Sequence, residues 1–200
     1  IRFNSFLSNF GVNEKNFKAE IYLNDEPIEL SANFNDDDYE IYDLKIEGTV
    51  EKGIFVGRLD ARNADEKILG ECNKVLQEGI SVTAGISNWR DSDCGKYTIK
   101  LCHFEMKKIN SGLTDAELKQ IRARMGIAGG VSVFRDNVRV LPYGEPENDF
   151  LELETRRSKS AGYYLFSHRN MFGRIDITTK DNPNLEDKSS REGLLENRYF

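Results

Sequence analysis

Short stretches in which apolar and polar residues alternate recur along this chain, and turn residues separate them. A period of two is typical of β-strands, because successive side chains of a strand point to opposite faces. The pattern predicts strands over residues 18–23, 28–30, 39–47, 53–59, 79–87, 97–105, 131–134, 138–141 and 171–178. Hairpins are expected around Glu51-Lys52-Gly53 and around Asp136-Asn137. Asp and Asn tolerate positive φ, so the second hairpin is expected to have a primed turn.

Apolar residues at helical spacing are found in other segments. Residues 2–10 and residues 64–77 each predict a helix. Thr114-Asp115-Ala116-Glu117 has the pattern of a capping box, in which the Glu side chain reaches back to the amide of the Thr. The helix that this box begins is expected to end at Gly126.

The order of these elements indicates the fold class. Strands and helices do not alternate regularly, so we expect an α+β fold, with helices packed on one face of a mixed, mostly antiparallel sheet. Residues 1–34 are expected to form an N-terminal arm of a helix and a hairpin. Residues 35–200 are expected to form one α+β domain, truncated at its C-terminal helix.

Composition narrows the class of protein. Hydrophobic residues make up 38% of the 200-residue chain, enough for a packed core. The net charge of −6 gives no whole-molecule attraction to nucleic acid or to a membrane surface. No apolar run approaches the roughly 20 residues that span a bilayer, and the first residues do not form a signal peptide. We therefore expect a cytoplasmic protein, and the missing initiator Met indicates an excised piece of a longer one.

The potential metal ligands do not form a recognisable set. Three cysteines at irregular spacing and two histidines give neither a disulfide framework nor a zinc signature, so no metal site is expected. Cys102 is expected to be a strand side chain, and the neighbouring His103 a surface or core residue. Asn35-Asp36-Asp37-Asp38 lacks the ligand spacing of a calcium loop, and we interpret it as a solvated turn.

Nucleotide-binding and hydrolase motifs are also absent from the sequence. The glycine-rich segment 126–130 follows a helix and precedes a strand, whereas a phosphate cradle usually follows a strand and precedes a helix. We therefore interpret it as a connection. No nucleophile–base pair stands out.

A basic group lies at Arg156, Arg157 and Lys159, with aromatic residues at Tyr163, Tyr164 and Phe166. One interpretation is a surface that binds nucleic acid through phosphate contacts and base stacking. The other is a solvated loop whose cations balance the preceding acidic residues. The sequence leaves both open.

A helix is expected to start around Glu192, with Ser190 or a residue near it as its cap. Two further cations, Lys188 and Arg191, lie in the loop before this helix. Cations are unfavourable at a helix N-terminus, which already carries partial positive charge. Their position is reasonable if an anion binds opposite them. The alternative is an exposed loop in which Glu192 offsets Arg191.

One group of proteins shares the pattern of four segments in the last third of the chain: 135–144, 148–151, 173–177 and 182–194. Across residues 129–197 the chain resembles the bacterial Hsp90-like ATP-binding proteins, which belong to the superfamily of gyrase B, histidine kinases and MutL and are related to the MORC ATPases. The matching part is the transducer domain, an α+β fold that follows the nucleotide-binding domain.

The resemblance implies a role within a larger ATPase. The superfamily's nucleotide-binding motifs are not found in this chain, so it would not hydrolyse ATP alone. Its partner would be an N-terminal ATP-binding domain of the same protein, with ATP and Mg²⁺ bound there and a homodimer formed. The transducer contributes a cation to the γ-phosphate from a loop, a role that matches Arg191 first and Lys188 second. The rival expectation is a non-catalytic module that binds protein or nucleic acid.

Overall fold

The computed structural model describes most of the chain, namely residues 21–24, 26–28, 36–62, 80–85, 94–106, 111–145, 147–159, 166–189 and 192–200. The helices expected at 2–10 and 64–77 lie outside these ranges. The expected N-terminal hairpin is formed by β1 (Ile21–Leu23) and β2 (Glu26–Ile28). Within the described residues, no helix is long and apolar enough to cross a membrane.

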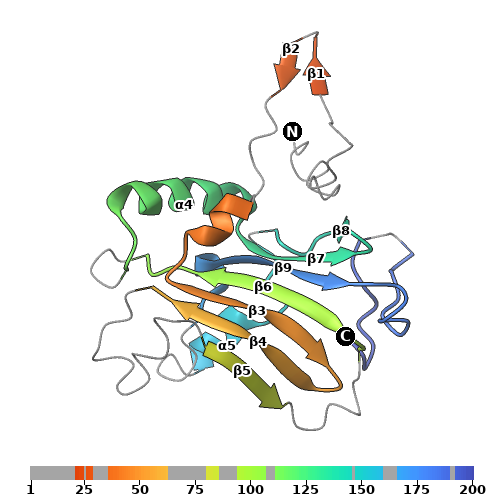
Figure 1. The fold of residues 1–200 in the computed structure, drawn as a ribbon. Helices are drawn as coiled ribbons and strands as arrows, with labels where there is room; N and C mark the ends of the chain where they lie inside the picture. The colour runs from red at the N-terminus through yellow and green to blue at the C-terminus, as the bar shows by residue number, and fades with distance from the viewer. Residues whose placement is uncertain are drawn as a thin grey trace.

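A seven-stranded sheet with the order β5-β4-β3-β6-β9-β7-β8 forms the centre of the molecule (Figure 1). Every neighbouring pair is antiparallel except β7 and β9, which are parallel. The strands are β3 (Leu44–Glu51), β4 (Ile54–Ala61), β5 (Ile80–Gly85), β6 (Tyr97–His103), β7 (Gly130–Arg135), β8 (Val138–Val140) and β9 (Met171–Ile177). The predicted α+β class with a mixed, mostly antiparallel sheet is confirmed.

Two tight hairpins form where the sequence predicts them. Between β3 and β4 the register closes on the pair Glu51↔Ile54, which leaves a two-residue turn. Between β7 and β8 the turn residues Asp136 and Asn137 have φ angles of 49° and 67°. Positive φ at both central residues is the primed geometry that matches the twist of paired strands, so that prediction is confirmed.

Helix α4 (Asp115–Ala128) begins with the predicted capping box. Glu117 accepts a hydrogen bond from the Thr114 amide at 2.7 Å, and the Thr114 hydroxyl accepts one from the Glu117 amide at 3.3 Å. The bond from the Thr114 amide, and a second one that the Thr114 hydroxyl donates to the Glu117 carboxylate at 2.8 Å, lower the pKa of Glu117 together with Arg62. The helix continues two residues past the expected end at Gly126, and the Gly129 amide closes it by donating to the Met125 carbonyl at 3.1 Å.

Helix α4 packs over the last residues of β6 and the first residues of β9. Between them lies a cluster of mostly aromatic and aliphatic side chains. The stacked rings of Phe104 and Phe172 lie at its centre, with centroids 5.3 Å apart. Cys102 lies in strand β6, as expected, and its side chain is fully buried in this cluster. Burial raises the pKa of its thiol to about 12, which disfavours the nucleophilic thiolate. The buried members of the cluster are Tyr39, Cys102, Phe104, Leu113, Leu118, Ile121, Met125 and Phe172.

The acidic segment before β3 differs from its prediction. Residues Asp36–Glu40 form a 3₁₀ turn, η1, in which Asp38 is only 1% exposed and forms an ion pair with Arg124 of α4. The interpretation as a solvated turn was therefore wrong for Asp38. Its partner lies 86 residues away in the sequence, so no local pattern could indicate the pairing.

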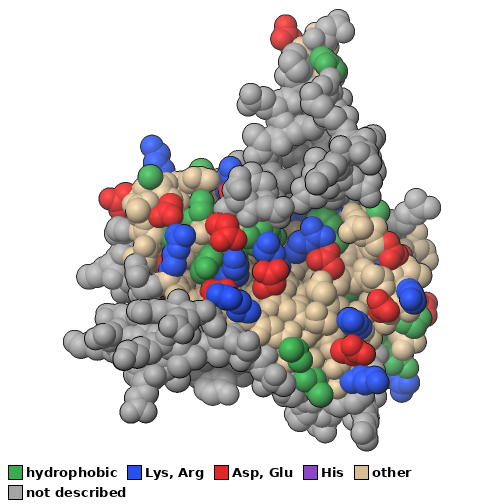
Figure 2. Space-filling model, in the orientation of Figure 1, with side chains coloured by type: hydrophobic (Ala, Val, Ile, Leu, Met, Phe, Trp, Pro, Cys, Tyr) green, Lys and Arg blue, Asp and Glu red, His purple; other side chains and the backbone are tan. Residues whose placement is uncertain are grey.

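Charged side chains of both signs are interspersed over the described part of the surface in Figure 2. Arg58 pairs with Asp60 at 2.8 Å along β4, and Arg174 pairs with Asp176 along β9. Figure 2 shows no broad region of a single sign on the described part of this face.

The Asp38–Arg124 pair predicts a large effect on stability. Replacing Arg124 by Met should lower the free energy of unfolding by about 3 kcal/mol, because it leaves a buried carboxylate without its cation. Urea denaturation at pH 7 measures the change. Lys119→Met on the exposed side of the same helix is the matched control and should change stability by less than about 0.5 kcal/mol. Equal effects of the two substitutions would contradict the prediction.

Candidate functional site

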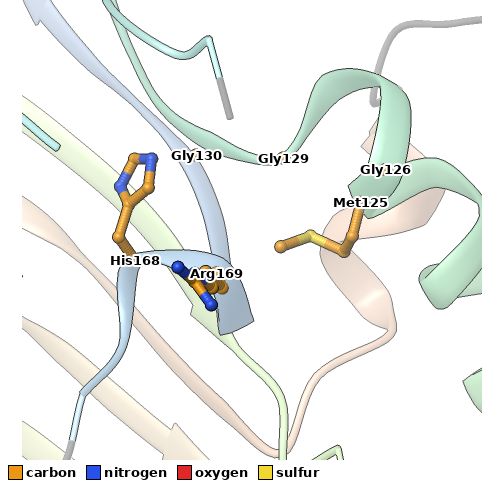
Figure 3. Close-up of a pocket in the computed structure, with 6 residues that line it drawn as sticks. All are labelled: Met125, Gly126, Gly129, Gly130, His168 and Arg169. Atoms are coloured by element: carbon orange, nitrogen blue, oxygen red, sulfur yellow. The ribbon is translucent and has the colours of Figure 1, made fainter. Parts of the chain in front are cut away.

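A hollow lies where the end of α4 turns into the start of β7 (Figure 3). Its volume is about 300 Å³, and three of its lining residues are glycines, so much of its wall is backbone. Figure 3 shows the Met125 side chain directed across the hollow toward Arg169, with the imidazole of His168 beside Gly130. The described residues that line the hollow are Met125, Gly126, Gly129, Gly130, His168 and Arg169.

His168 is the buried polar group of this hollow. It lies in η5 (His168–Asn170), the 3₁₀ turn that leads into β9, and is 3% exposed. Its Nδ1 is 3.8 Å from Oδ1 of Asp149, and its Nε2 has no hydrogen-bond partner among the described residues. The ring therefore faces a carboxylate on one side, and on the other side its Nε2 is buried without a described partner.

Asp149 is held in place by the start of helix α5 (Leu153–Lys159). Its two carboxylate oxygens accept hydrogen bonds from the amides of Leu153 at 2.9 Å and Glu154 at 2.7 Å. These are amides at the helix N-terminus that have no partner within the helix. The carboxylate thus stabilises α5 and at the same time faces His168.

A second carboxylate ties α5 to η5. Glu154 accepts a hydrogen bond from the Ser167 hydroxyl and one from the Arg169 amide at 3.4 Å. The Ser167 hydroxyl is the main reason that the pKa of Glu154 is lowered. The Arg169 side chain is exposed and forms no ion pair with another described residue.

Gly130 allows the imidazole to lie against the start of β7. Its φ is +102°, and a Cβ added there would be 3.0 Å from Cε1 and 3.1 Å from Nε2 of His168. Only glycine combines this backbone conformation with that proximity. The segment 126–130 joins helix to strand as predicted, but its first three residues belong to α4 and Gly130 belongs to β7, so that Gly129 alone lies between them. Three of its glycines line the hollow.

The described groups do not form a hydrolytic or metal centre. The Ser167 hydroxyl donates to Glu154, and Cys102 is buried in the core. No cluster of three His, Cys, Asp or Glu side chains that could hold a metal ion occurs in the described ranges. The exposed guanidinium of Arg169, which lines the hollow, is the described side chain there that can donate hydrogen bonds to a bound ligand.

The predicted cationic loop near the C-terminus is a separate region, and its structure differs from expectation. Residues 192–200 do not form a helix. Instead Asp187 pairs with Leu194 in an antiparallel bridge, and the Lys188 amide donates to the Gly193 carbonyl at 2.9 Å. Gly193 has a φ of +96°, and Leu194 is only 2% exposed, so tertiary packing keeps this segment extended.

Tyr143 and Arg135 attach this segment to the β7–β8 side of the sheet. The Tyr143 hydroxyl accepts a hydrogen bond from the Leu194 amide at 3.0 Å. Arg135, the last residue of β7, forms an ion pair with Asp187 at 2.8 Å and donates to the Leu185 carbonyl. The chain on one side of the loop is thereby fixed to the end of β7, and the chain on the other side to Tyr143, which follows β8.

The sequence-predicted cations have different outcomes. Lys188 is 37% exposed and pairs with Glu196 at 3.2 Å, whereas Arg191 lies outside the described residues. Arg156, Arg157 and Lys159 share the last turn of α5, so their interpretation as a loop was wrong. Cations are favourable at a helix C-terminus, which gives this turn a structural reason for its composition.

Sequence reasoning did not find the group around His168. Its members come from α4, the segment before α5, and η5, so they have no common spacing in the sequence. The available signal was that His168 is one of only two histidines, which by itself points to no chemistry.

The chain has no significant match to a protein-family model, a curated protein or a solved structure. The geometry of its two regions is therefore the basis for a functional conclusion.

The Tyr143–Leu194 contact can be tested directly. Tyr143→Phe leaves a buried backbone amide without an acceptor, which should lower the free energy of unfolding by about 1–3 kcal/mol. Hydrogen exchange of the Leu194 amide should accelerate more than exchange in β6. Tyr199→Phe removes a hydroxyl that contacts the exposed Arg198 and is the matched control. Unchanged exchange at Leu194 would show that the contact does not hold the segment.

Proposed function

We propose that this chain is the transducer domain of an Hsp90-like ATPase, in which it couples ATP binding and hydrolysis by an N-terminal domain to movement and dimerisation. The resemblance over residues 129–197 supports this proposal. That range contains β7, β8, β9 and the C-terminal segment that packs against Tyr143. The ATP and Mg²⁺ would be bound by the N-terminal domain.

One observation carries the proposal: the short segment of the sequence that contains both cations lies between two residues, Asp187 and Leu194, that are attached to the sheet side of the domain. Asp187 on one side and Leu194 on the other are attached to Arg135 and Tyr143, respectively. A cation stabilises a transferring phosphoryl group only if its position is set in advance. The anchors at Asp187 and Leu194 fix the described ends of the loop, which supports this requirement.

The same loop would couple the nucleotide state of the N-terminal domain to the position of the sheet. A γ-phosphate that binds Arg191 or Lys188 would pull on Asp187 and Leu194, and through them on the end of β7 and on the segment after β8. The Lys188–Glu196 pair does not oppose this, because an exposed ion pair contributes little stability and its partner is 74% exposed. Loss of the γ-phosphate on hydrolysis would release the two domains.

Turnover by the full-length protein tests the proposal. Arg191→Ala should reduce kcat at least a hundredfold while ATP binding remains, because cations that contact the transferring phosphoryl group contribute about 10³–10⁵ in related chemistry. Lys188→Ala is measured beside it, to establish which of the two makes the contact. Lys180→Ala, an exposed lysine in the turn after β9, is the control and should leave kcat unchanged.

Either of two results would contradict the proposal. One is a kcat close to that of the wild type in both loop variants. The other is micromolar ATP binding by the 200-residue chain alone, measured by calorimetry, since the nucleotide pocket would then lie within it.

A second candidate function is a non-catalytic module that binds nucleic acid or protein. The observation that favours it is the last turn of α5, where Arg156, Arg157 and Lys159 form no ion pair with another described residue and no residue of the helix is buried. Three exposed cations on one turn can contact successive phosphates.

Replacing these three cations together by Gln should abolish salt-dependent binding of single-stranded DNA in a gel-shift assay if this turn is the binding surface. The control changes the net charge equally at three exposed lysines elsewhere, Lys52, Lys119 and Lys180. Equal loss in both triple variants would indicate a general charge effect, and no binding by the unmodified chain would remove this candidate.

A further inference from the structure

Toward the β3–β4 hairpin, the face of the sheet on which α4 packs carries exposed side chains. Directly paired residues share a face of a sheet, and successive residues of a strand alternate between its two faces. Cys102, buried under α4, pairs with Lys45 of β3, which pairs with Asp60 of β4. Farther along this same face, which we call the β3–β4 face, lie Glu47, Thr49, Glu51, Ile54, Val56 and Arg58.

Two apolar residues of β4 are exposed on the β3–β4 face. Ile54 is 48% exposed and Val56 is 58% exposed. In Figure 1, β3 and β4 lie in front of α5, and Figure 2 shows hydrophobic side chains beside charged ones over this part of the sheet. The solvated face of an antiparallel sheet usually carries polar residues, so a valine there favours a contact with another surface.

Uncharged side chains continue across the sheet from Val56. It pairs with Thr49 of β3, which pairs with Thr98 of β6. The three residues form one row across three neighbouring strands, at a single height along the strand direction. A depletion of charge is typical of the centre of a protein–protein interface.

The next row of the β3–β4 face is charged. Glu47 pairs with Arg58 of β4 on one side and with Lys100 of β6 on the other. Opposite charges in directly paired positions stabilise a sheet by themselves, so this row has a reason within one copy of the chain. That reason does not extend to the exposed Val56. The Arg58 side chain is also 61% exposed beside Asp60, and a guanidinium with five N–H donors can bind more than one carboxylate.

A two-fold axis that runs along the strands, between β3 and β4, makes this face complementary to itself. The axis keeps each height along the strands and exchanges β3 with β4. Glu47 of each copy then faces Arg58 of the other, and Val56 faces Thr49. An axis centred on β3 would instead place Glu47 opposite Glu47 and Arg58 opposite Lys100, so the charges select the first arrangement.

We propose that the β3–β4 face binds a second copy of this chain, with Glu47 of each copy paired to Arg58 of the other. Sheets that pack face to face keep their strands within about 30° of each other, as an axis along the strands requires. The charges determine the register and Val56 supplies apolar contact, because charge pairs contribute to specificity more than to affinity. This inference does not depend on the proposed function.

The size of the face indicates a weak dimer. Strands of eight residues at about 3.4 Å each, in a layer from β5 to β6 with about 4.8 Å between strands, cover about 500 Å² per copy. A standard interface buries about 800 Å² per partner, so we expect association only at about 0.1–1 mM protein.

Sedimentation equilibrium of the 200-residue chain at low salt tests the proposal. The unmodified chain should form dimers that dissociate on dilution. Glu47→Arg and Arg58→Glu should each weaken self-association at least tenfold, because each places like charges opposite each other twice in a symmetric interface. An equimolar mixture of these two variants should associate again, since two positive charges of one copy then meet two negative charges of the other.

A substitution without a change of charge gives an independent comparison. Val56→Thr keeps the β-branched shape and removes a methyl group from the contact, so it should weaken self-association about fivefold. Val138→Thr makes the same change at an exposed valine of β8, which is 53% exposed, and should leave self-association unchanged. This pair of variants decides the matter if a charge-reversal variant does not fold.

Three results would overturn the proposal. One is an unmodified chain that stays monomeric at 1 mM. Another is a mixture of Glu47→Arg and Arg58→Glu that associates no more strongly than either variant alone. The third is an equal effect of Val56→Thr and Val138→Thr, which would place any dimer contact elsewhere on the molecule.

Discussion

The pairing of β9 with two different strands is the constraint on which the described structure depends. Phe172 lies opposite Cys102 of β6 in an antiparallel pair and opposite Gly130 of β7 in a parallel pair. This register places fully buried Phe172 under α4, where its ring stacks on Phe104. A slip of one residue would turn Phe172 to the opposite face of the sheet, so the core and the register determine each other.

The same pairing positions both candidate regions. Because β7 and β9 are parallel, their first residues lie together and so do their last. His168, just before β9, therefore meets Gly130 at the start of β7, while the segment after β9 meets Arg135 at the end of β7. The two regions lie at opposite ends of one strand pair, about 16 Å apart at roughly 3.3 Å per residue.

Two buried carboxylates attach segments outside the sheet, namely η1 and the segment before α4, to the rest of the fold. Asp38 joins the 3₁₀ turn η1 to α4 through Arg124. Asp43 accepts hydrogen bonds from the Ser111 hydroxyl at 2.9 Å and from the Gly112 amide at 2.7 Å, which attaches the segment before α4 to the start of β3. A buried carboxylate is tolerated only when such donors satisfy it, so each also restricts the paths that the chain can take.

The sequence by itself determined the local elements. Period-two alternation located most strands, the Thr114 box located the start of α4, and Asp136-Asn137 specified its turn, because each of these depends on neighbouring residues alone. The tertiary structure decided the rest. It buried Asp38, kept Glu192 and the residues after it out of a helix, and brought His168 to Gly130. These outcomes depend on contacts between residues far apart in the chain. The free energy of those contacts outweighs the conformational preference that each segment has by itself.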